Sequence, residues 1–356
     1  MIGPGEPAHP GAEKTDRRWA IGLDIGGTKI AAGIVARDGR VRDRQVIATP
    51  PRADAATVRR VVAELVRRLR RRHPGVTAIG VGAAGMIDWP TGHIRWAPNN
   101  AYRDLPLQQV LAADTGLPTV VENDANAAAW AEARIGAGAG YRDVIVLTVG
   151  TGVGGGFVLG GRLYRGRTGV GGEVGHLLVD PTGGQRCGCG SVGCLEALAS
   201  GTALGRAGRA AARADPGGLL ARLARGAESV TGETVFRAAR LGDPVARALF
   251  DELGGWLGVG IASLVALFDP ELVLIGGGLA EVGDLLVTPT RASFERFVFA
   301  RDRRTLPPVM PARLGADAGM VGAALLALDR YALPPAPPPG RSERRRPAPR
   351  TAAGGP

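Results

Sequence analysis

The three cysteines of this chain lie in one glycine-rich segment that also contains a histidine. The four residues are His176, Cys187, Cys189 and Cys194. Three thiolates and an imidazole satisfy the tetrahedral preference of a structural Zn²⁺ ion and leave no position open for a catalytic water. The alternative is three unrelated buried thiols, but the glycines between them offer little apolar sequence for burial. We therefore predict a zinc site that shapes the protein without reacting itself.

Two further glycine-rich segments could bind phosphate. The first is the loop Asp24-Ile-Gly26-Gly27-Thr28-Lys29, and the second is Gly150-Thr151-Gly152. In the first loop, backbone N–H groups, a hydroxyl and an ammonium gather where no Cβ blocks close approach. It lacks the spacing of a Walker A or dinucleotide-binding motif, so alone it could equally be a structural hairpin. Together, the loops could hold a polyphosphate between them, with Asp24 orienting Mg²⁺ directly or through water.

A third polar motif, Glu122-Asn123-Asp124-Ala-Asn126, follows an apolar run and begins a predicted helix. Such a junction is the usual place for polar groups to face a ligand crevice in α/β folds. Asp124 could cap the helix, or it could act as a general base, which typically contributes ~10²–10⁴ in rate. Asn123 offers both a donor and an acceptor, as a sugar's hydroxyls require.

Length and composition indicate a globular α/β protein of two lobes. The chain has 356 residues, which exceeds the usual size of one domain. Its hydrophobic content of 45% and its 56 glycines fit a globular protein with many tight turns. Only 4% of its residues are aromatic, which argues against a protein that stacks nucleic-acid bases.

The net charge of +11 is concentrated in two places, a predicted helix ending near residue 72 and the C-terminal tail. The only lysines are Lys14 and Lys29, so arginine use is a general bias of this chain. We predict a solvated arginine face and no direct nucleic-acid binding. The first 18 residues lack the pattern of a signal peptide, and the uncharged segment 144–161 suits a buried glycine-rich hairpin better than a membrane span. A cytoplasmic protein without membrane contact is expected.

The elements that must position these motifs fall into two similar sets. Apolar strands at 19–24 and 30–35 flank the first glycine loop, and strands at 144–149 and 157–159 flank the second, which indicates an internal duplication. We predict a small α/β lobe over 19–122 and a large α/β lobe with the zinc motif over 123–315, with a helix at about 316–330 packing back on the first lobe. Residues 1–18 and 334–356 are predicted to be disordered.

In their order along the chain, these motifs resemble those of the ROK family. The resemblance covers about residues 20–328 and includes Glu173-Val-Gly-His176, the cysteine segment up to Glu196, and Gly276-Gly277-Gly278. The family implies the duplicated, two-lobed actin/hexokinase-like (ribonuclease H-like) fold. It holds sugar kinases and sugar-responsive repressors.

The resemblance also implies roles for individual residues. Asp124 matches the family's catalytic base for the sugar 6-hydroxyl. The matching sugar contacts are Asn99, Asn123, Glu173, His176 and Glu196. The matching zinc ligands are His176, Cys187, Cys189 and Cys194. The implied ATP-binding residues are Asp24, Gly26, Gly27, Thr28, Lys29, Gly150, Thr151, Gly152, Gly276, Gly277 and Gly278, with Mg²⁺ accompanying the ATP. His176 would serve zinc with one ring nitrogen and the sugar with the other.

The implied reaction is phosphoryl transfer from ATP to the 6-hydroxyl of glucose. Alternatives within the family are another hexose (N-acetylmannosamine, N-acetylglucosamine, fructose or mannose), polyphosphate as donor, or a non-catalytic sugar sensor. A repressor would need a DNA-binding domain, and the stretch before Asp24 is too short for one. The family further suggests a homodimer or homotetramer.

Overall fold

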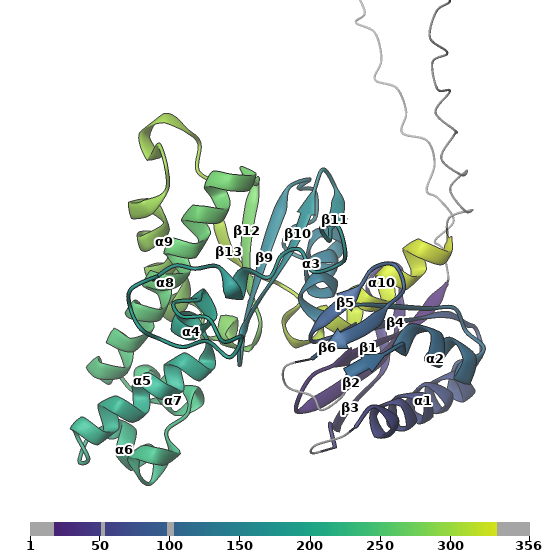
Figure 1. Cartoon of the computed structure of the whole chain (residues 1–356), viewed down its shortest axis with the longest axis horizontal. Coiled ribbons are helices and arrows are strands. Elements are labelled where there is room, and N and C mark those ends of the chain that lie inside the picture. Colours follow the sequence, from purple (N-terminus) through teal and green to yellow (C-terminus); the bar gives the residue numbers. More distant parts are fainter. Residues whose placement is uncertain (1–17, 51–53, 98–102, 333–356) are drawn as a thin grey trace, which may run out of the picture.

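A computed structural model describes residues 18–50, 54–97 and 103–332 of the chain. Two five-stranded sheets dominate it (Figure 1). The first has the order β3-β2-β1-β4-β8, and its strands are β1 (Trp19–Ile25), β2 (Lys29–Ala36), β3 (Val41–Ala48), β4 (Val76–Ala83) and β8 (Thr119–Asn123). Strands β1 to β3 form an antiparallel meander, whereas β1, β4 and β8 run parallel.

The second sheet repeats the plan of the first. Its order is β11-β10-β9-β12-β13, and its strands are β9 (Val144–Val149), β10 (Val153–Leu159), β11 (Arg162–Tyr164), β12 (Leu272–Gly276) and β13 (Val309–Pro311). Here too the first three strands are antiparallel, and β9, β12 and β13 are parallel. The predicted duplication and the predicted fold class are confirmed.

Helices cover both sheets. Those near the first sheet are α1 (Ala55–Arg72) and α2 (Leu107–Thr115), beside a small sheet of β5 (Met86–Asp88), β6 (His93–Trp96) and β7 (Arg103–Leu105). Those near the second are α4 (Leu195–Ala199), α5 (Gly201–Ala214), α6 (Leu219–Ala224), α7 (Gly232–Arg240), α8 (Pro244–Phe268) and α9 (Asp284–Phe297). Short 3₁₀ turns include η1 (Val174–His176) and η3 (Gly278–Val282).

The helices α3 (Asp124–Ile135) and α10 (Ala318–Ala332) pack against each other in the middle of the molecule (Figure 1). The backbone of α10 lies almost on β4, since a Cβ added at Gly80 would be 1.8 Å from the carbonyl oxygen of Ala323. Helix α3 also contacts β10, where a Cβ at Gly156 would be 2.5 Å from Ala129 Cβ. Helix α3 thus contacts elements of both sheets, so its contacts alone do not assign it to one lobe. The predicted lobe boundary at residue 122 stays a proposal.

Helix α8 begins at Pro244, ten residues before the uniformly apolar stretch from Gly254 that by itself would predict a helix, and it belongs to the core. Two residues typical of a helix start mark its beginning. Asp243 is the N-cap and accepts a hydrogen bond from Ala246 N at 2.7 Å, and Pro244 occupies the first turn. By length and composition α8 could cross a membrane, but more than half of its most apolar stretch is buried, and it packs along α9. Its apolarity is therefore explained by the core.

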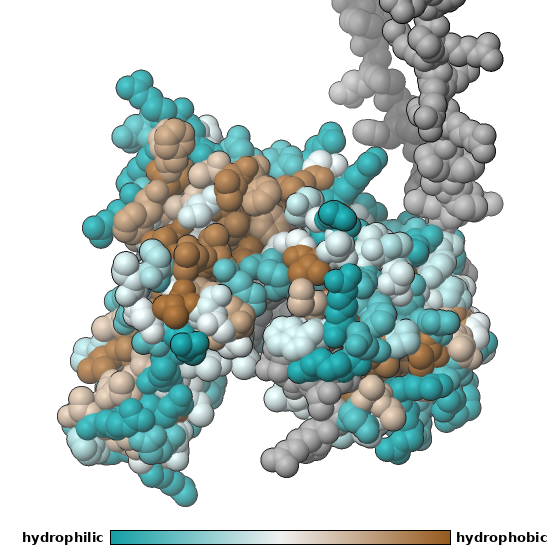
Figure 2. Space-filling view, viewed as in Figure 1, coloured by the Kyte–Doolittle hydropathy of each residue, from teal (hydrophilic) through white to brown (hydrophobic). Residues whose placement is uncertain are grey.

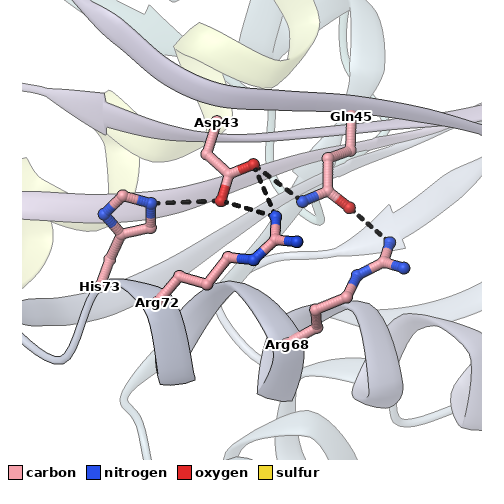
Figure 3. Close-up of polar contacts among 5 residues, drawn as sticks. All are labelled: Asp43, Gln45, Arg68, Arg72 and His73. Atoms are coloured by element: carbon pink, nitrogen blue, oxygen red, sulfur yellow. Dashed lines mark hydrogen bonds and ion pairs between the residues drawn. The ribbon is translucent and has the colours of Figure 1, made fainter.

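Many arginines of α1 bind neighbouring elements of the fold. Figure 3 shows Arg72 and His73 contacting Asp43 of β3, with Arg68 donating to Gln45. Hydrogen bonding from Gln45, joined by Arg72 and His73, holds the pKa of Asp43 below its usual value. These contacts fasten α1 to the edge strand of the first sheet.

Candidate active site

Asp24 and the Asn123–Asp124 junction lie at one edge of the first sheet. In the strand register, Asp24 is level with Gly82 of β4, and Ala83 is level with Asn123 of β8. The three parallel strands therefore end together and present these polar residues side by side, as expected for a ligand crevice in an α/β sheet.

The capping role that Asp124 could have had belongs to Asn123. Its Oδ1 accepts a hydrogen bond from Asn126 N at 3.0 Å, and its Nδ2 donates to the carbonyl oxygen of Gly85 at 3.3 Å. The helix starts at Asp124, whose Oδ1 accepts from Ala125 N at 2.9 Å. The alternative of Asp124 as a bare N-cap is therefore wrong, and the second oxygen of its carboxylate is left for other chemistry.

Carboxylates from both halves of the chain influence one another at this edge. Burial, joined by the charges of Asp124 and Asp317, raises the pKa of Asp24 to about 7, and Lys29 opposes them. Burial also raises the pKa of Asp124. Perturbed groups of this kind are typical of functional sites.

Glu173, which follows the first three strands of the second sheet, belongs to the same group of charges. Desolvation raises the pKa of its carboxyl although the residue as a whole is exposed, His176 lowers this pKa, and the carboxylates of Asp124 and Glu196 raise it. The charges of the predicted base Asp124 and of two predicted sugar contacts, His176 and Glu196, therefore all act on Glu173. The remaining predicted contact, Asn99, lies outside the described residues.

The first glycine loop is a tight turn between β1 and β2. Gly26 N donates to the carbonyl oxygen of Lys29 at 3.0 Å, and the hydroxyl of Thr49 donates to Gly26 O at 2.8 Å. Gly27, Thr28 and Lys29 remain exposed. A cation, a hydroxyl and exposed backbone are therefore available to an anionic ligand next to Asp24.

The second glycine loop and the Gly276–Gly278 segment lie against each other. Gly277 has a φ of +85°, and a Cβ there would be 2.5 Å from the carbonyl oxygen of Val149, which directly precedes Gly150. Only glycine fits this close approach at a positive φ. Two of the three predicted nucleotide-binding segments are therefore adjacent.

Thr202, which was not predicted as a site residue, stabilises the second glycine loop, Gly150 to Gly152. Its hydroxyl donates to Thr151 O at 2.7 Å, and Gly201 N donates to Gly150 O at 2.8 Å. The signal for it was available, because Ser200-Gly201-Thr202 starts α5 with Ser200 as the N-cap residue.

The predicted zinc ligands come together. The ligand atoms of His176, Cys187, Cys189 and Cys194 all lie within 4.8 Å of one another. Cys189 Sγ is 3.7 Å from Cys194 Sγ, and Cys187 Sγ is 3.6 Å from His176 Nδ1. Metal bonds of about 2.0–2.3 Å in a tetrahedron require ligand separations of roughly 3.5–3.8 Å, and these two distances lie in that range, so the four residues could hold a metal ion.

Glu196 connects this cysteine cluster with the second glycine loop. Its Oε2 accepts a hydrogen bond from Val153 N at 2.9 Å, and its Oε1 lies 3.9 Å from Cys187 Sγ. A Cβ at Gly152 would be 2.2 Å from Glu196 Oε2, so glycine is required for this contact. The predicted sugar contact therefore also supports the loop.

Comparisons with known proteins agree with this arrangement. A family model described as ROK family matches residues 20–330. A glucokinase of Streptomyces coelicolor is 44% identical over 310 residues, which cover 86% of this chain and 96% of that protein. An N-acetylmannosamine kinase of Shigella boydii is 37% identical over 311 residues, 86% of this chain and 97% of that protein.

Among solved structures, the chain is similar to a ROK family glucokinase from Streptomyces griseus in complex with glucose and AMPPNP. The sequences are 46% identical, the match covers 87% of this chain and 99% of that chain, and the TM-score is 0.80.

Proposed function

Because this chain belongs to the ROK family, we propose that it is an ATP-dependent glucokinase that phosphorylates the 6-hydroxyl of glucose. The observation that carries the proposal is the half-buried Asp124 carboxylate, whose charge acts on Asp24 of the first glycine loop and on Glu173. The similarity to glucokinases over 86% of the chain supports glucose as the sugar.

In this proposal Asp124 accepts the proton of the sugar hydroxyl as that oxygen attacks the terminal phosphate of ATP. Positioning and electrostatic stabilisation supply most of the rate in such transfers. Asn123, Glu173, His176 and Glu196, with Asn99, would hold the sugar's hydroxyls.

The glycine segments would hold the nucleotide. Gly26 to Lys29 and Gly150 to Gly152 would bind its phosphates, and Gly276 to Gly278 would line the adenosine pocket. Mg²⁺, when bound with ATP, would offset phosphate charge, and Asp24 would hold it directly or through water.

We also propose that Zn²⁺ occupies the cluster of His176 and the three cysteines. The Nδ1 atom of His176 faces Cys187, which leaves Nε2 to donate to a sugar hydroxyl. Zinc would thereby fix the tautomer and the orientation of this donor.

We also propose that the protein forms a homodimer or homotetramer and acts in the cytoplasm. Large apolar side chains that are exposed in the described chain include Leu267, Phe297 and Phe299. Figure 2 shows hydrophobic surface over the part of the molecule that contains α8 and α9. Such a surface is suited to subunit contact.

Release of ADP in the presence of Mg·ATP and a panel of hexoses tests the function. We expect the highest kcat/KM with glucose. Since a relative 37% identical is an N-acetylmannosamine kinase, that sugar and N-acetylglucosamine, mannose and fructose belong in the panel. A higher kcat/KM with one of these would replace glucose as the substrate, and no turnover with any hexose would overturn the kinase assignment.

The reaction is expected to lose kcat/KM for Mg·ATP as the pH falls through about 7. Asp24 has a pKa raised to about 7, so it is ionised above this pH and protonated below it, and only the carboxylate attracts Mg²⁺. The parameter kcat/KM reports groups of the free enzyme, so the effect should be weaker in kcat at saturation. The concentration of Mg·ATP is held constant at each pH as the control. A flat kcat/KM between pH 8 and 6 would contradict this role of Asp24.

A further inference from the structure

An ion pair with a buried carboxylate adjoins the Asn123–Asp124 junction. Glu122 is 2% exposed, and its Oε2 accepts a hydrogen bond from Arg165 Nε at 2.6 Å. Its Oε1 accepts from Asn123 N and from Asn126 Nδ2, both at 3.1 Å. The Glu122 carboxylate therefore binds both the backbone of Asn123, which precedes Asp124, and the side chain of Asn126, two residues after it.

Arg165 comes from the other sheet, immediately after its edge strand β11. Its guanidinium lies 3.8 Å from the ring centre of Trp89, and its carbonyl oxygen accepts from Gly171 N at 2.9 Å. Trp89 N in turn donates to Thr168 O at 3.1 Å. The segment from Arg165 to Gly171 is therefore fixed to Trp89 and to Glu122 of the first sheet.

This segment leads directly to Glu173 and His176, two of the proposed sugar contacts. The Arg165–Glu122 pair is thus a direct side-chain link between the junction that carries the proposed base and the segment that carries those sugar contacts.

We propose that Arg165 and Glu122 are positioning residues, which set the placement of Asp124 relative to the sugar-binding segment. The proposal rests on the glucokinase function proposed above. Catalysis by proximity is sensitive to small displacements, and a shift of ~1 Å can reduce the rate by ~10²-fold. A buried ion pair need not stabilise a fold, because desolvation of the charges offsets their attraction. Its presence beside the proposed base is better explained by the geometry that it imposes.

The test compares Arg165→Met with the double variant Arg165→Met/Glu122→Gln. Arg165→Met keeps an unbranched side chain over Trp89 but leaves the Glu122 carboxylate buried without its cation, so a loss of stability is expected together with a loss of activity. In the double variant the buried charge is gone, and the amide oxygen of the substituted side chain can still accept from Asn123 N and Asn126 Nδ2. Its melting temperature should therefore return toward that of the wild type.

The double variant should nevertheless turn over glucose at least ~10-fold more slowly, with KM for ATP within about threefold of wild type, because the link between the two segments is broken. The matched control is Arg213→Met, which breaks an exposed ion pair with Glu228 and should leave all parameters unchanged. Wild-type kcat in a double variant of restored stability would mean that the pair is merely structural and would overturn the proposal.

Hydrogen exchange supplies a readout that does not depend on activity. We expect faster exchange of amides in residues 123–126 and 166–176 of the double variant, with other segments unchanged. If the wild type showed no hexose-dependent ADP release, the proposed function would fail, while unchanged exchange in these segments would refute the positioning role by itself.

Discussion

Asp124→Asn is expected to reduce kcat with glucose by at least ~10²-fold while glucose still binds. Asparagine has nearly the same shape, and its side-chain oxygen can still accept from Ala125 N, as Asp124 Oδ1 does at 2.9 Å. The helix start is therefore kept, because its cap is Asn123. What the variant loses is the ability to take a proton from the sugar hydroxyl. Steady-state ADP release gives kcat, and calorimetric titration with glucose gives the affinity.

A surface substitution of the same type separates charge loss from loss of the base. Asp114→Asn removes an aspartate of α2 that forms an ion pair with Arg59 of α1. This variant should keep kcat within about twofold of the wild-type value. If Asp124→Asn turned over glucose at a near-normal rate, Asp124 would not be the base. If it bound no glucose, the residue would serve the sugar site and its catalytic role would need a different variant.

The placement of the proposed catalytic groups could be predicted because strand ends and glycine loops leave strong local signals. The run 19–24 before Gly26 predicted β1, and the junction at Asn123 predicted the end of β8, so Asp24 and Asp124 could be assigned to ligand-facing positions from the sequence. The cysteine spacing likewise predicted a cluster, and the four ligand atoms lie within 4.8 Å.

Contacts between distant segments could not be predicted in the same way. Arg165 was one of many arginines in the sequence, and nothing in its neighbours indicated that it reaches Glu122. Glu196 was assigned to the sugar, yet its hydrogen bond to Val153 N depends on the fold of residues far away in sequence. Whether Asn123 or Asp124 is the N-cap depends on where the helix begins to within one residue, and sequence patterns do not resolve helix ends that finely.

Cys189→Ala is expected to lower the zinc content from about one ion per chain and to weaken glucose binding by at least ~10-fold. Cys189 is exposed, whereas Cys187 and Cys194 are buried, so its removal leaves no cavity in the core. Loss of the metal would release His176, and with it the segment that carries Glu173. Glu196 would also lose its ordered neighbour Cys187, which lies 3.9 Å from its carboxylate. Metal analysis by mass spectrometry and calorimetric titration with glucose measure the two effects.

Arg186→Ala is the matched control, since it removes a hydrogen bond to Gly190 O in the same loop without removing a ligand. It should retain both zinc and glucose affinity. Removal of zinc from the wild type with a chelator should reproduce the Cys189→Ala defect, and added zinc should reverse it in the wild type but not in the variant. If the zinc content fell and glucose affinity stayed unchanged, the metal would not shape the sugar site, and the alignment of His176 would have to come from the turn Val174–His176 alone.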